Sequence, residues 1–282
     1  MNKKFTESAI WIYFRWHIVQ VDSIYRKIAV QTNGDLFCFL FNFMARLRKK
    51  DVRFYFDKKE RIYSAVSKKY KRYFFSKFQN YNCYLGGIEN RGISLGETYF
   101  LPRIEFNDND TVIDCGANVG DLKIYFDENK LKVNYIAIEP SPKEYYCLYK
   151  NVAPSETYNI GLWNKNGSLD FFVSSHNADS SFLTPVSYSE KVTITTKRLD
   201  SFLDKNIRLL KIEAEGAEPE VLIGCEKLLD KVDYISADLG FERGITQEST
   251  LAPVTNFLLR NNFELIDFST PRIIALYKRI GI

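Results

Sequence analysis

A short apolar run followed directly by a glycine-rich turn is found in Asp110-Thr-Val-Ile-Asp-Cys-Gly-Ala-Asn-Val-Gly120. Apolar runs of about four to eight residues are typical of buried strands. Glycine at positions 116 and 120 permits a tight turn and a close approach of a ligand to the backbone. A helix-like segment then continues to Asn129. The order of strand, turn and helix predicts a nucleotide-type binding site at the carboxyl end of a parallel strand.

The residues around this turn indicate which ligand it binds. The next expected strand ends in Glu139, 25 residues after Asp114, and an acidic side chain there can accept hydrogen bonds from both ribose hydroxyls of an adenosine. Asp114 would repel a pyrophosphate but could hold a ligand that carries an ammonium and a sulfonium. The dinucleotide fingerprint and the Walker motif are both absent. The pattern therefore favours S-adenosylmethionine over a plain turn or a dinucleotide. The expected cofactor-binding residues are Asp114, Gly116, Ala117, Asn118, Gly120, Glu139 and Pro140.

Strand-like and helix-like segments alternate from about residue 99 to the end of the chain. A strand over 208–213 continues the pattern after a β-rich insertion near 168–196. The last two strands, 263–268 and 273–278, are joined by only four residues. They must be antiparallel, because a parallel connection needs about a dozen residues or more. The predicted fold class is α/β, a doubly wound Rossmann-like sheet with an antiparallel last strand and a ligand crevice at the carboxyl ends of its strands.

The composition narrows the class of protein. The 282 residues are 45% hydrophobic and 26% charged, as in an ordinary globular protein. The five cysteines are scattered and never paired as C-x-x-C, and only two histidines are present. Neither a disulfide framework nor a metal site is therefore expected. The longest apolar run, 36–43, is far shorter than the roughly 20 residues that a bilayer span requires, and no secretory signal is found. We expect a cytoplasmic protein.

Charge divides the chain into two regions. Residues 1–80 hold 18 Lys and Arg against 6 Asp and Glu, whereas the remainder holds 21 against 29. We predict a basic, aromatic, mainly helical N-terminal segment over 1–95 and an α/β domain over 96–282. Three roles stay open for the segment. It could cap the domain, attach residues 1–80 to the anionic inner face of a membrane, or bind single-stranded nucleic acid. No RNA-binding motif supports the third role, so nucleic acid is the least expected partner.

Three charged side chains near the end of the 208–213 strand are candidate catalytic residues. Lys211, Glu213 and Glu215 would point to the same face of a continuing strand. Methyl transfer to a hydroxyl requires a general base within hydrogen-bond reach. We hypothesise that Glu215 or Glu213 accepts the proton or holds the acceptor hydroxyl, with Lys211 tuning the charge. A structural ion pair is the alternative. His176, in a polar loop, is a second candidate base or an exposed residue without a role.

Several stretches of the chain resemble the FkbM-type methyltransferases. They fall within about residues 95–280 and comprise Asp110–Gly120, Ile138–Pro140, Asp179–Phe182, Thr195–Leu203 and Leu210–Glu218. The resemblance implies a class I methyltransferase fold and transfer of a methyl group from S-adenosylmethionine to an oxygen. The acceptor in such enzymes is often a hydroxyl of a sugar or glycan, which here could be lipid-linked or a surface polysaccharide. This chain has Glu213 where the family usually has Asp, which lengthens that side chain by one methylene.

Two other functions remain compatible with the sequence. The chain could be a methyltransferase for RNA or a small metabolite, which the basic N-terminal segment would favour if it bound nucleic acid. It could also be a non-catalytic binding or scaffold protein that keeps the cofactor fold. The presence of Asp114, Glu139 and Glu215 argues against the scaffold.

Overall fold

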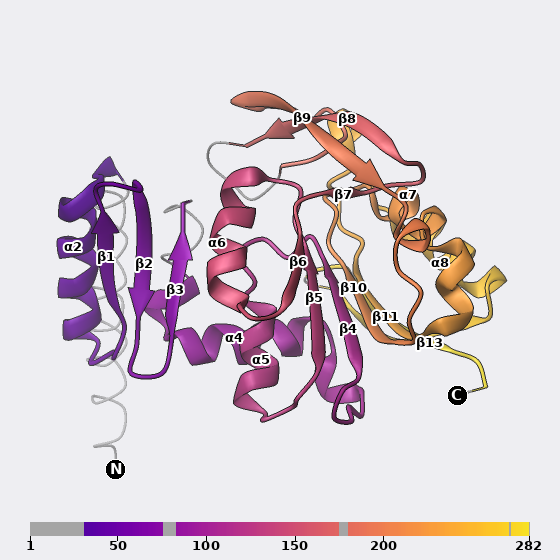
Figure 1. The fold of residues 1–282 in the computed structure, drawn as a ribbon, viewed down its shortest axis with the longest axis horizontal. Coiled ribbons are helices and arrows are strands. Elements are labelled where there is room, and N and C mark those ends of the chain that lie inside the picture. Colours follow the sequence, from indigo (N-terminus) through magenta and orange to yellow (C-terminus); the bar gives the residue numbers. More distant parts are fainter. Residues whose placement is uncertain (1–30, 76–82, 175–179, 271, 282) are drawn as a thin grey trace, which may run out of the picture.

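The computed structural model describes residues 31–75, 83–174, 180–270 and 272–281 of the chain. Its main sheet contains the strands β4 (Thr111–Cys115), β5 (Asn134–Ile138), β6 (Glu156–Tyr158), β10 (Ile207–Ile212), β11 (Val232–Asp238), β12 (Phe263–Ser269) and β13 (Ile274–Arg279). Their order across the sheet is β12-β13-β11-β10-β4-β5-β6 (Figure 1). The strands from β6 to β11 pair in parallel, whereas β13 is antiparallel to both β11 and β12. The predicted sheet with an antiparallel last strand is confirmed.

Helices cover both faces of this sheet. They are α4 (Ile88–Thr98), α5 (Leu122–Glu128), α6 (Pro142–Val152), α7 (Glu218–Ile223) and α8 (Leu251–Arg260), with short 3-10 turns η1 (Leu101–Arg103), η2 (Leu199–Ser201), η3 (Glu226–Lys231) and η4 (Gly244–Thr246). Successive strand residues face opposite sides of a sheet. Val112 and Leu209 accordingly belong to the core beneath α5 and α6, whereas Ile113 and Leu210 belong to the core beneath α7 and α8. The doubly wound architecture is therefore also confirmed.

The expected β-rich insertion forms a separate three-stranded sheet. It consists of β7 (Gly161–Leu162), β8 (Gly167–Val173) and β9 (Glu190–Lys197), with β8 and β9 antiparallel. Figure 1 shows it beyond one end of the main strands. Phe171 and Phe182 pack against each other within the insertion, with ring centroids 4.8 Å apart.

The N-terminal segment contains a sheet that the sequence pattern did not predict. Alongside helix α2 (Gly34–Leu47), the strands β1 (Arg53–Asp57), β2 (Ile62–Val66) and β3 (Lys71–Phe74) form a three-stranded antiparallel sheet (Figure 1). The expectation of a mainly helical segment was incomplete on this point. Hairpin turns usually place glycine or asparagine where φ is positive. The β1–β2 turn instead places Arg61 at φ 56°, so its sequence carries no hairpin signal.

Aromatic side chains join the N-terminal segment to the rest of the protein. Phe41 of α2 packs on Phe54 of β1 with ring centroids 6.0 Å apart, and Phe74 of β3 packs on Tyr84 at 5.6 Å. Ile124 of α5 belongs to the same buried cluster. The segment therefore shares a continuous core with the α/β domain. The division at residue 95 stays a prediction, because α4 runs across that position.

Two glycines allow α4 to approach α5 closely. A Cβ atom at Gly92 would lie 2.4 Å from Cβ of Ile124 and 3.0 Å from its carbonyl carbon. At Gly96 a Cβ atom would lie 2.0 Å from the ring of Tyr125. No real side chain tolerates such distances, so this helix contact requires glycine at both positions.

No helix among the described residues is long and apolar enough to cross a membrane. Contact of residues 1–80 with a membrane surface stays a prediction, and residues 1–30 lie outside the described part of the chain. Within that part, α2 leaves Leu36, Phe39 and Leu47 more than half exposed.

We predict that Gly92→Ala lowers the free energy of unfolding. Overpacking a well-packed contact costs about 1–3 kcal/mol, which exceeds the gain of up to about 1 kcal/mol from replacing glycine by alanine in a helix. Urea denaturation followed by circular dichroism measures the change. Gly86→Ala is the matched control, because a Cβ atom there meets nothing within 4 Å. A Gly92→Ala protein as stable as the wild type would contradict the close packing of α4 on α5.

Candidate active site

A cavity of about 960 Å³ opens at the carboxyl ends of β4, β5 and β10. The β-rich insertion contributes Phe171 and Phe182 to its wall. Six of the seven expected cofactor-binding residues line it: Asp114, Gly116, Ala117, Asn118, Glu139 and Pro140. Gly120 does not line this cavity. A Cβ atom at Gly120 would instead lie 2.4 Å from Val152 and 2.7 Å from Leu148, so this glycine serves the packing of α6.

The first glycine of the turn is held against the neighbouring strand. Gly116 adopts a φ of 71°, which L side chains rarely adopt. A Cβ atom there would lie 1.8 Å from the backbone oxygen of Glu213. The amides of Gly116 and Ala117 both donate to the backbone oxygen of Ile138, at 3.0 and 3.1 Å. The turn is thus fixed between β5 and the residues that follow β10, and only glycine fits at its centre.

Glu139 presents a buried carboxylate at the end of β5. One of its oxygens accepts a hydrogen bond from the amide of Asn118 and the other from the amide of Ser141, both at 2.8 Å. Burial raises the pKa of Glu139 to about 8. Each carboxylate oxygen has a further lone pair. Glu139 could therefore hold a pair of ligand hydroxyls while keeping its contacts with the glycine turn.

Lys211 is the centre of a buried network of charges. Its Nζ lies 2.9 Å from Oδ1 of Asp114 and 3.0 Å from Oε2 of Glu213, and it donates to the backbone oxygen of Gly116 at 2.9 Å. The second oxygen of Asp114 accepts a hydrogen bond from the hydroxyl of Tyr135. Burial opposes the charge on Lys211, but its two carboxylate neighbours raise the pKa of the ammonium above its ordinary value. The Asp114 carboxylate, which we expected to face the ligand's ammonium, is engaged by Lys211 and Tyr135.

Glu213 also contacts a cation that no motif in the sequence indicated. Arg272, in the loop between β12 and β13, forms ion pairs with both Glu213 and Asp238. Burial alone would raise the pKa of Glu213, but Lys211 and Arg272 together lower it to about 2. Glu213 is therefore ionised across the physiological range and is a weak proton acceptor. The four-residue connection predicted that the two strands are antiparallel, but nothing in the sequence indicated that Arg272 within it reaches the cavity.

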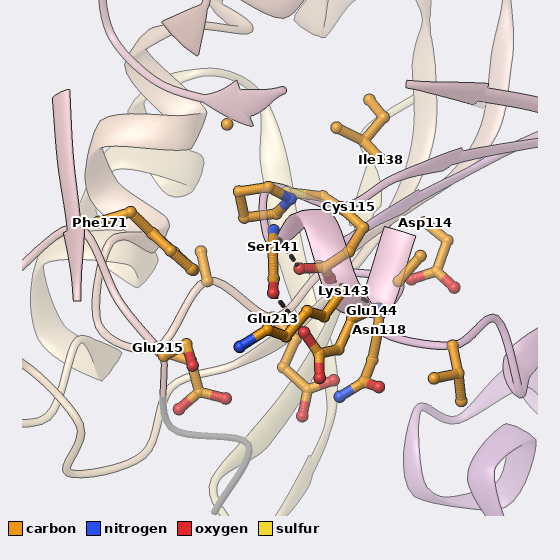
Figure 2. Close-up of a pocket in the computed structure, with 18 of the residues that line it drawn as sticks. Asp114, Cys115, Asn118, Ile138, Ser141, Lys143, Glu144, Phe171, Glu213 and Glu215 are labelled. Carbon is orange, nitrogen blue, oxygen red and sulfur yellow. Dashed lines mark hydrogen bonds between the residues drawn. The ribbon is translucent and has the colours of Figure 1, made fainter. Parts of the chain in front are cut away.

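Glu215 lines the same cavity, although it does not continue the strand (Figure 2). Strand β10 ends at Ile212, and Glu215 adopts a φ of 49°. The alternation that placed Lys211, Glu213 and Glu215 on one strand face therefore stops before Glu215. The turn that carries Glu215 is held by Glu218, a fully buried carboxylate that accepts hydrogen bonds from the amides of Ala214 and Gly216 and from the hydroxyl of Thr250.

One more carboxylate in the cavity wall was not predicted. Glu242 follows β11 and lines the cavity with Glu213 and Glu215. Burial raises the pKa of Glu242 to about 7, and the negative charge of Asp238 adds to the rise. His176, the other predicted base, lies outside the described residues, although Ser174 and Ser180 on either side of that stretch line the cavity.

The order of the seven strands and the reversed β13, with a cavity beyond the glycine turn, are those of the class I methyltransferase fold. Comparison with known families is specific: the model of the methyltransferase FkbM domain matches residues 114–265, just over half of the chain. The chain belongs to this family, and it is an S-adenosylmethionine-dependent methyltransferase. The expected family, fold and cofactor are confirmed.

The individual relatives are distant. Methyltransferase 1 of Beauveria bassiana (strain ARSEF 2860) is 24% identical over 169 residues, which cover 49% of this chain and 68% of that protein. The 2-O-methyltransferase NoeI of Sinorhizobium fredii (strain NBRC 101917 / NGR234) is 22% identical over 178 residues, which cover 55% and 72%. The crystal structure of methyltransferase FkbM from Methylobacillus flagellatus KT matches with a TM-score of 0.46 and 19% identity. That match covers 62% of this chain and 44% of the other.

We predict that adenosine binding depends on the ionisation of Glu139. An ionised carboxylate accepts hydrogen bonds from both ribose hydroxyls, whereas a protonated one loses part of that capacity. Because the pKa of Glu139 in the free protein is about 8, affinity should fall by up to about tenfold per pH unit below pH 8 and level off above it. Calorimetric titration with adenosine, which carries no amino-acid charges, measures this dependence.

The matched variants are Glu139→Gln and Glu264→Gln. Glutamine at 139 should bind adenosine weakly and without pH dependence between pH 6 and 9. Glu264 is exposed on β12, so its variant should behave as the wild type. Equal wild-type affinities at pH 6.5 and pH 9 would contradict the role of Glu139.

Proposed function

We propose that this methyltransferase transfers its methyl group to an oxygen, namely a hydroxyl of a sugar or glycan. The observation that carries the proposal is the pair of carboxylates Glu215 and Glu242 in the cavity wall, beside Glu213, which Lys211 and Arg272 neutralise. Carboxylates accept hydrogen bonds from hydroxyl groups. A polyanionic acceptor such as RNA is a poorer match for these two carboxylates, because nucleic acids are bound mainly through cations that neutralise their phosphates. An uncharged acceptor with several hydroxyls is the better match for this wall.

The relatives support the same class of reaction. NoeI, a 2-O-methyltransferase by name, aligns with 55% of this chain. The resemblance of the motifs to FkbM-type enzymes also favours a sugar or glycan hydroxyl as acceptor.

The cofactor-binding roles follow from the geometry of the turn. In this proposal Glu139 holds the two ribose hydroxyls, and the backbone from Gly116 to Asn118 lies along the ligand, where the absence of a side chain at Gly116 permits close contact. Lys211, paired with Asp114, holds the glycine turn in place through its hydrogen bond to the backbone oxygen of Gly116. S-Adenosylmethionine, when bound, supplies a methyl group on a positively charged sulfur that leaves as a neutral thioether.

The acceptor hydroxyl must lose its proton as the new bond between oxygen and carbon forms. Glu213 is a weak base because two cations hold its pKa near 2. General bases work best when their pKa lies near the operating pH. Glu242, with a pKa of about 7, meets this condition. We therefore assign proton acceptance to Glu242 and orientation of the acceptor hydroxyl to Glu215. The oxygen gains a methyl group, and its proton moves to the Glu242 carboxylate.

Transfer of tritium from methyl-labelled S-adenosylmethionine tests this function. The purified protein is incubated with a lipid-linked glycan extract or with total RNA, and label is counted in each fraction. We expect label in the glycan fraction, released as O-methyl sugars by acid hydrolysis. Glu242→Gln should slow transfer by about 100-fold or more, which is a typical contribution of a general base, while binding S-adenosylhomocysteine as the wild type does.

Two further variants complete the experiment. Glu215→Gln should mainly raise the acceptor concentration needed for half-maximal rate, because that residue is assigned to orientation. Glu264→Gln on the exposed face of β12 should behave as the wild type. Label confined to RNA would overturn the acceptor assignment, and an unimpaired Glu242→Gln protein would overturn the assignment of the base.

A further inference from the structure

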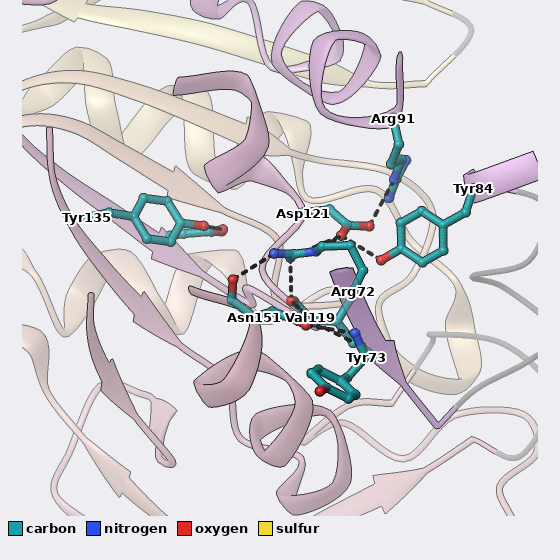
Figure 3. A network of polar contacts seen from close by, with 9 residues as sticks. Arg72, Tyr73, Tyr84, Arg91, Val119, Asp121, Tyr135 and Asn151 are labelled. Atoms are coloured by element: carbon teal, nitrogen blue, oxygen red, sulfur yellow. Dashed lines mark hydrogen bonds and ion pairs between the residues drawn. The ribbon is translucent and has the colours of Figure 1, made fainter. Parts of the chain in front are cut away.

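A buried cluster of charges joins the N-terminal segment to the glycine turn (Figure 3). Arg72 comes from β3, Arg91 from α4, and Asp121 stands directly before α5. The Nη2 atom of Arg72 lies 3.2 Å from Oδ1 of Asp121, and Nε of Arg91 lies 3.3 Å from Oδ2. The hydroxyl of Tyr84 donates to Oδ1 at 2.7 Å. The single carboxylate of Asp121 thus forms ion pairs with two guanidinium groups and accepts a hydrogen bond from a phenol.

Arg72 is fully occupied inside the protein. It is 2% exposed, and besides Asp121 it donates to the backbone oxygens of Val119 at 2.8 Å and Asn151 at 2.9 Å. Asn151 in turn exchanges hydrogen bonds with the backbone of Tyr73. These contacts fix β3 against the end of the glycine turn. Arg72 is buried and does not line the cavity, so it acts as a positioning residue and not as a ligand contact.

Arg91 is in a different situation. Among the described residues its one ion pair is with Asp121, and Arg72 shares the same carboxylate, so Asp121 alone does not neutralise both guanidinium groups. Tyr84 does not alter this balance, since burial raises its pKa well above the ordinary value and keeps the phenol neutral. The side chain of Arg91 is 28% exposed and lines the cavity next to Asp121. Charges with limited access to water are usually paired, so an anionic group in the cavity would complete the pairing of Arg91.

A second observation concerns the same cavity. The side-chain oxygen of Asn118 is buried and has no hydrogen-bond partner in the part of the chain that the structure describes. Asn118 also lines the cavity, and its backbone amide donates to Glu139. An unsatisfied acceptor requires a donor. A ligand that reaches from Glu139 past the turn would therefore find an acceptor at Asn118 and a cation at Arg91.

We propose that Arg91 and Asn118 bind the amino-acid head group of S-adenosylmethionine, with Arg91 on its carboxylate and the Asn118 side chain on its ammonium. Arginine matches the planar carboxylate with two parallel donors. The inference rests on the proposed placement of the ribose at Glu139. It makes the N-terminal segment part of the cofactor site, because α4 supplies Arg91 while β3, through Arg72, holds the Asp121 carboxylate that orients it.

Removal of the ligand's carboxylate alone provides the test. Decarboxylated S-adenosylmethionine keeps the adenosine, the sulfonium and the ammonium. By calorimetry, the wild type should bind S-adenosylmethionine at least about tenfold more tightly than the decarboxylated form, the contribution expected of a charge-assisted hydrogen bond. Arg91→Gln should reduce this preference to less than about threefold and leave the affinity for the decarboxylated ligand nearly unchanged.

Arg103→Gln is the matched control, because Arg103 is exposed, pairs with Asp267 and does not line the cavity. Arg91→Lys keeps the charge without the planar fork and should retain an intermediate preference, which keeps the assignment testable if Arg91→Gln folds poorly. An unchanged preference in Arg91→Gln, or an equal loss of both ligands in both Arg91 variants, would overturn the assignment. Failure of the wild type to bind either ligand would contradict the placement at Glu139 itself, and this inference with it.

Discussion

The ammonium of Lys211 holds together the two backbone turns on which the cavity is built. It reaches from the last residues of β10 to the backbone oxygen of Gly116, and it lies between the carboxylates of Asp114 and Glu213. The same two segments touch where Gly116 meets the backbone oxygen of Glu213, leaving no room for a side chain. Removing one partner of a buried ion pair typically costs about 3–5 kcal/mol, because the other charge is left without compensation. The shape of the cavity floor therefore depends on this one side chain.

The cavity wall carries charges of both signs. Arg91 lines it beside Asp121, whereas Glu215 and Glu242 line it together with Glu213, which Lys211 and Arg272 neutralise. This arrangement suits two different ligands. A zwitterionic cofactor can place its carboxylate at Arg91, and an uncharged acceptor can place its hydroxyls against Glu215 and Glu242. In this account the N-terminal segment also supports the cofactor site, because Arg72 of β3 holds Asp121 and the end of the glycine turn in place.

The elements that are determined by residues close together in the chain could be predicted from the sequence. The run from Asp110 to Gly120 predicted a strand and a glycine turn, and the four-residue connection after 268 predicted the antiparallel closing pair; both are confirmed. The β1–β2 hairpin could not be predicted, since Arg61 occupies a positive-φ turn position where glycine or asparagine is usual. The prediction that Lys211, Glu213 and Glu215 share one strand face was wrong for Glu215, because β10 ends at Ile212. Arg91, Glu242 and Arg272 reach the cavity from a helix and two loops that are distant in sequence, and only the tertiary fold brings them together.

The most direct measurement is a double-mutant cycle on the Lys211–Asp114 pair, with unfolding free energy and S-adenosylhomocysteine affinity as readouts. Lys211→Met should lower the free energy of unfolding by about 3 kcal/mol or more and weaken ligand binding. Adding Asp114→Asn should restore part of the stability, because one uncompensated charge is removed with it. Lys191→Met, at an exposed ion pair with Asp170, is the control and should match the wild type. A Lys211→Met protein with wild-type stability and wild-type affinity would contradict the account.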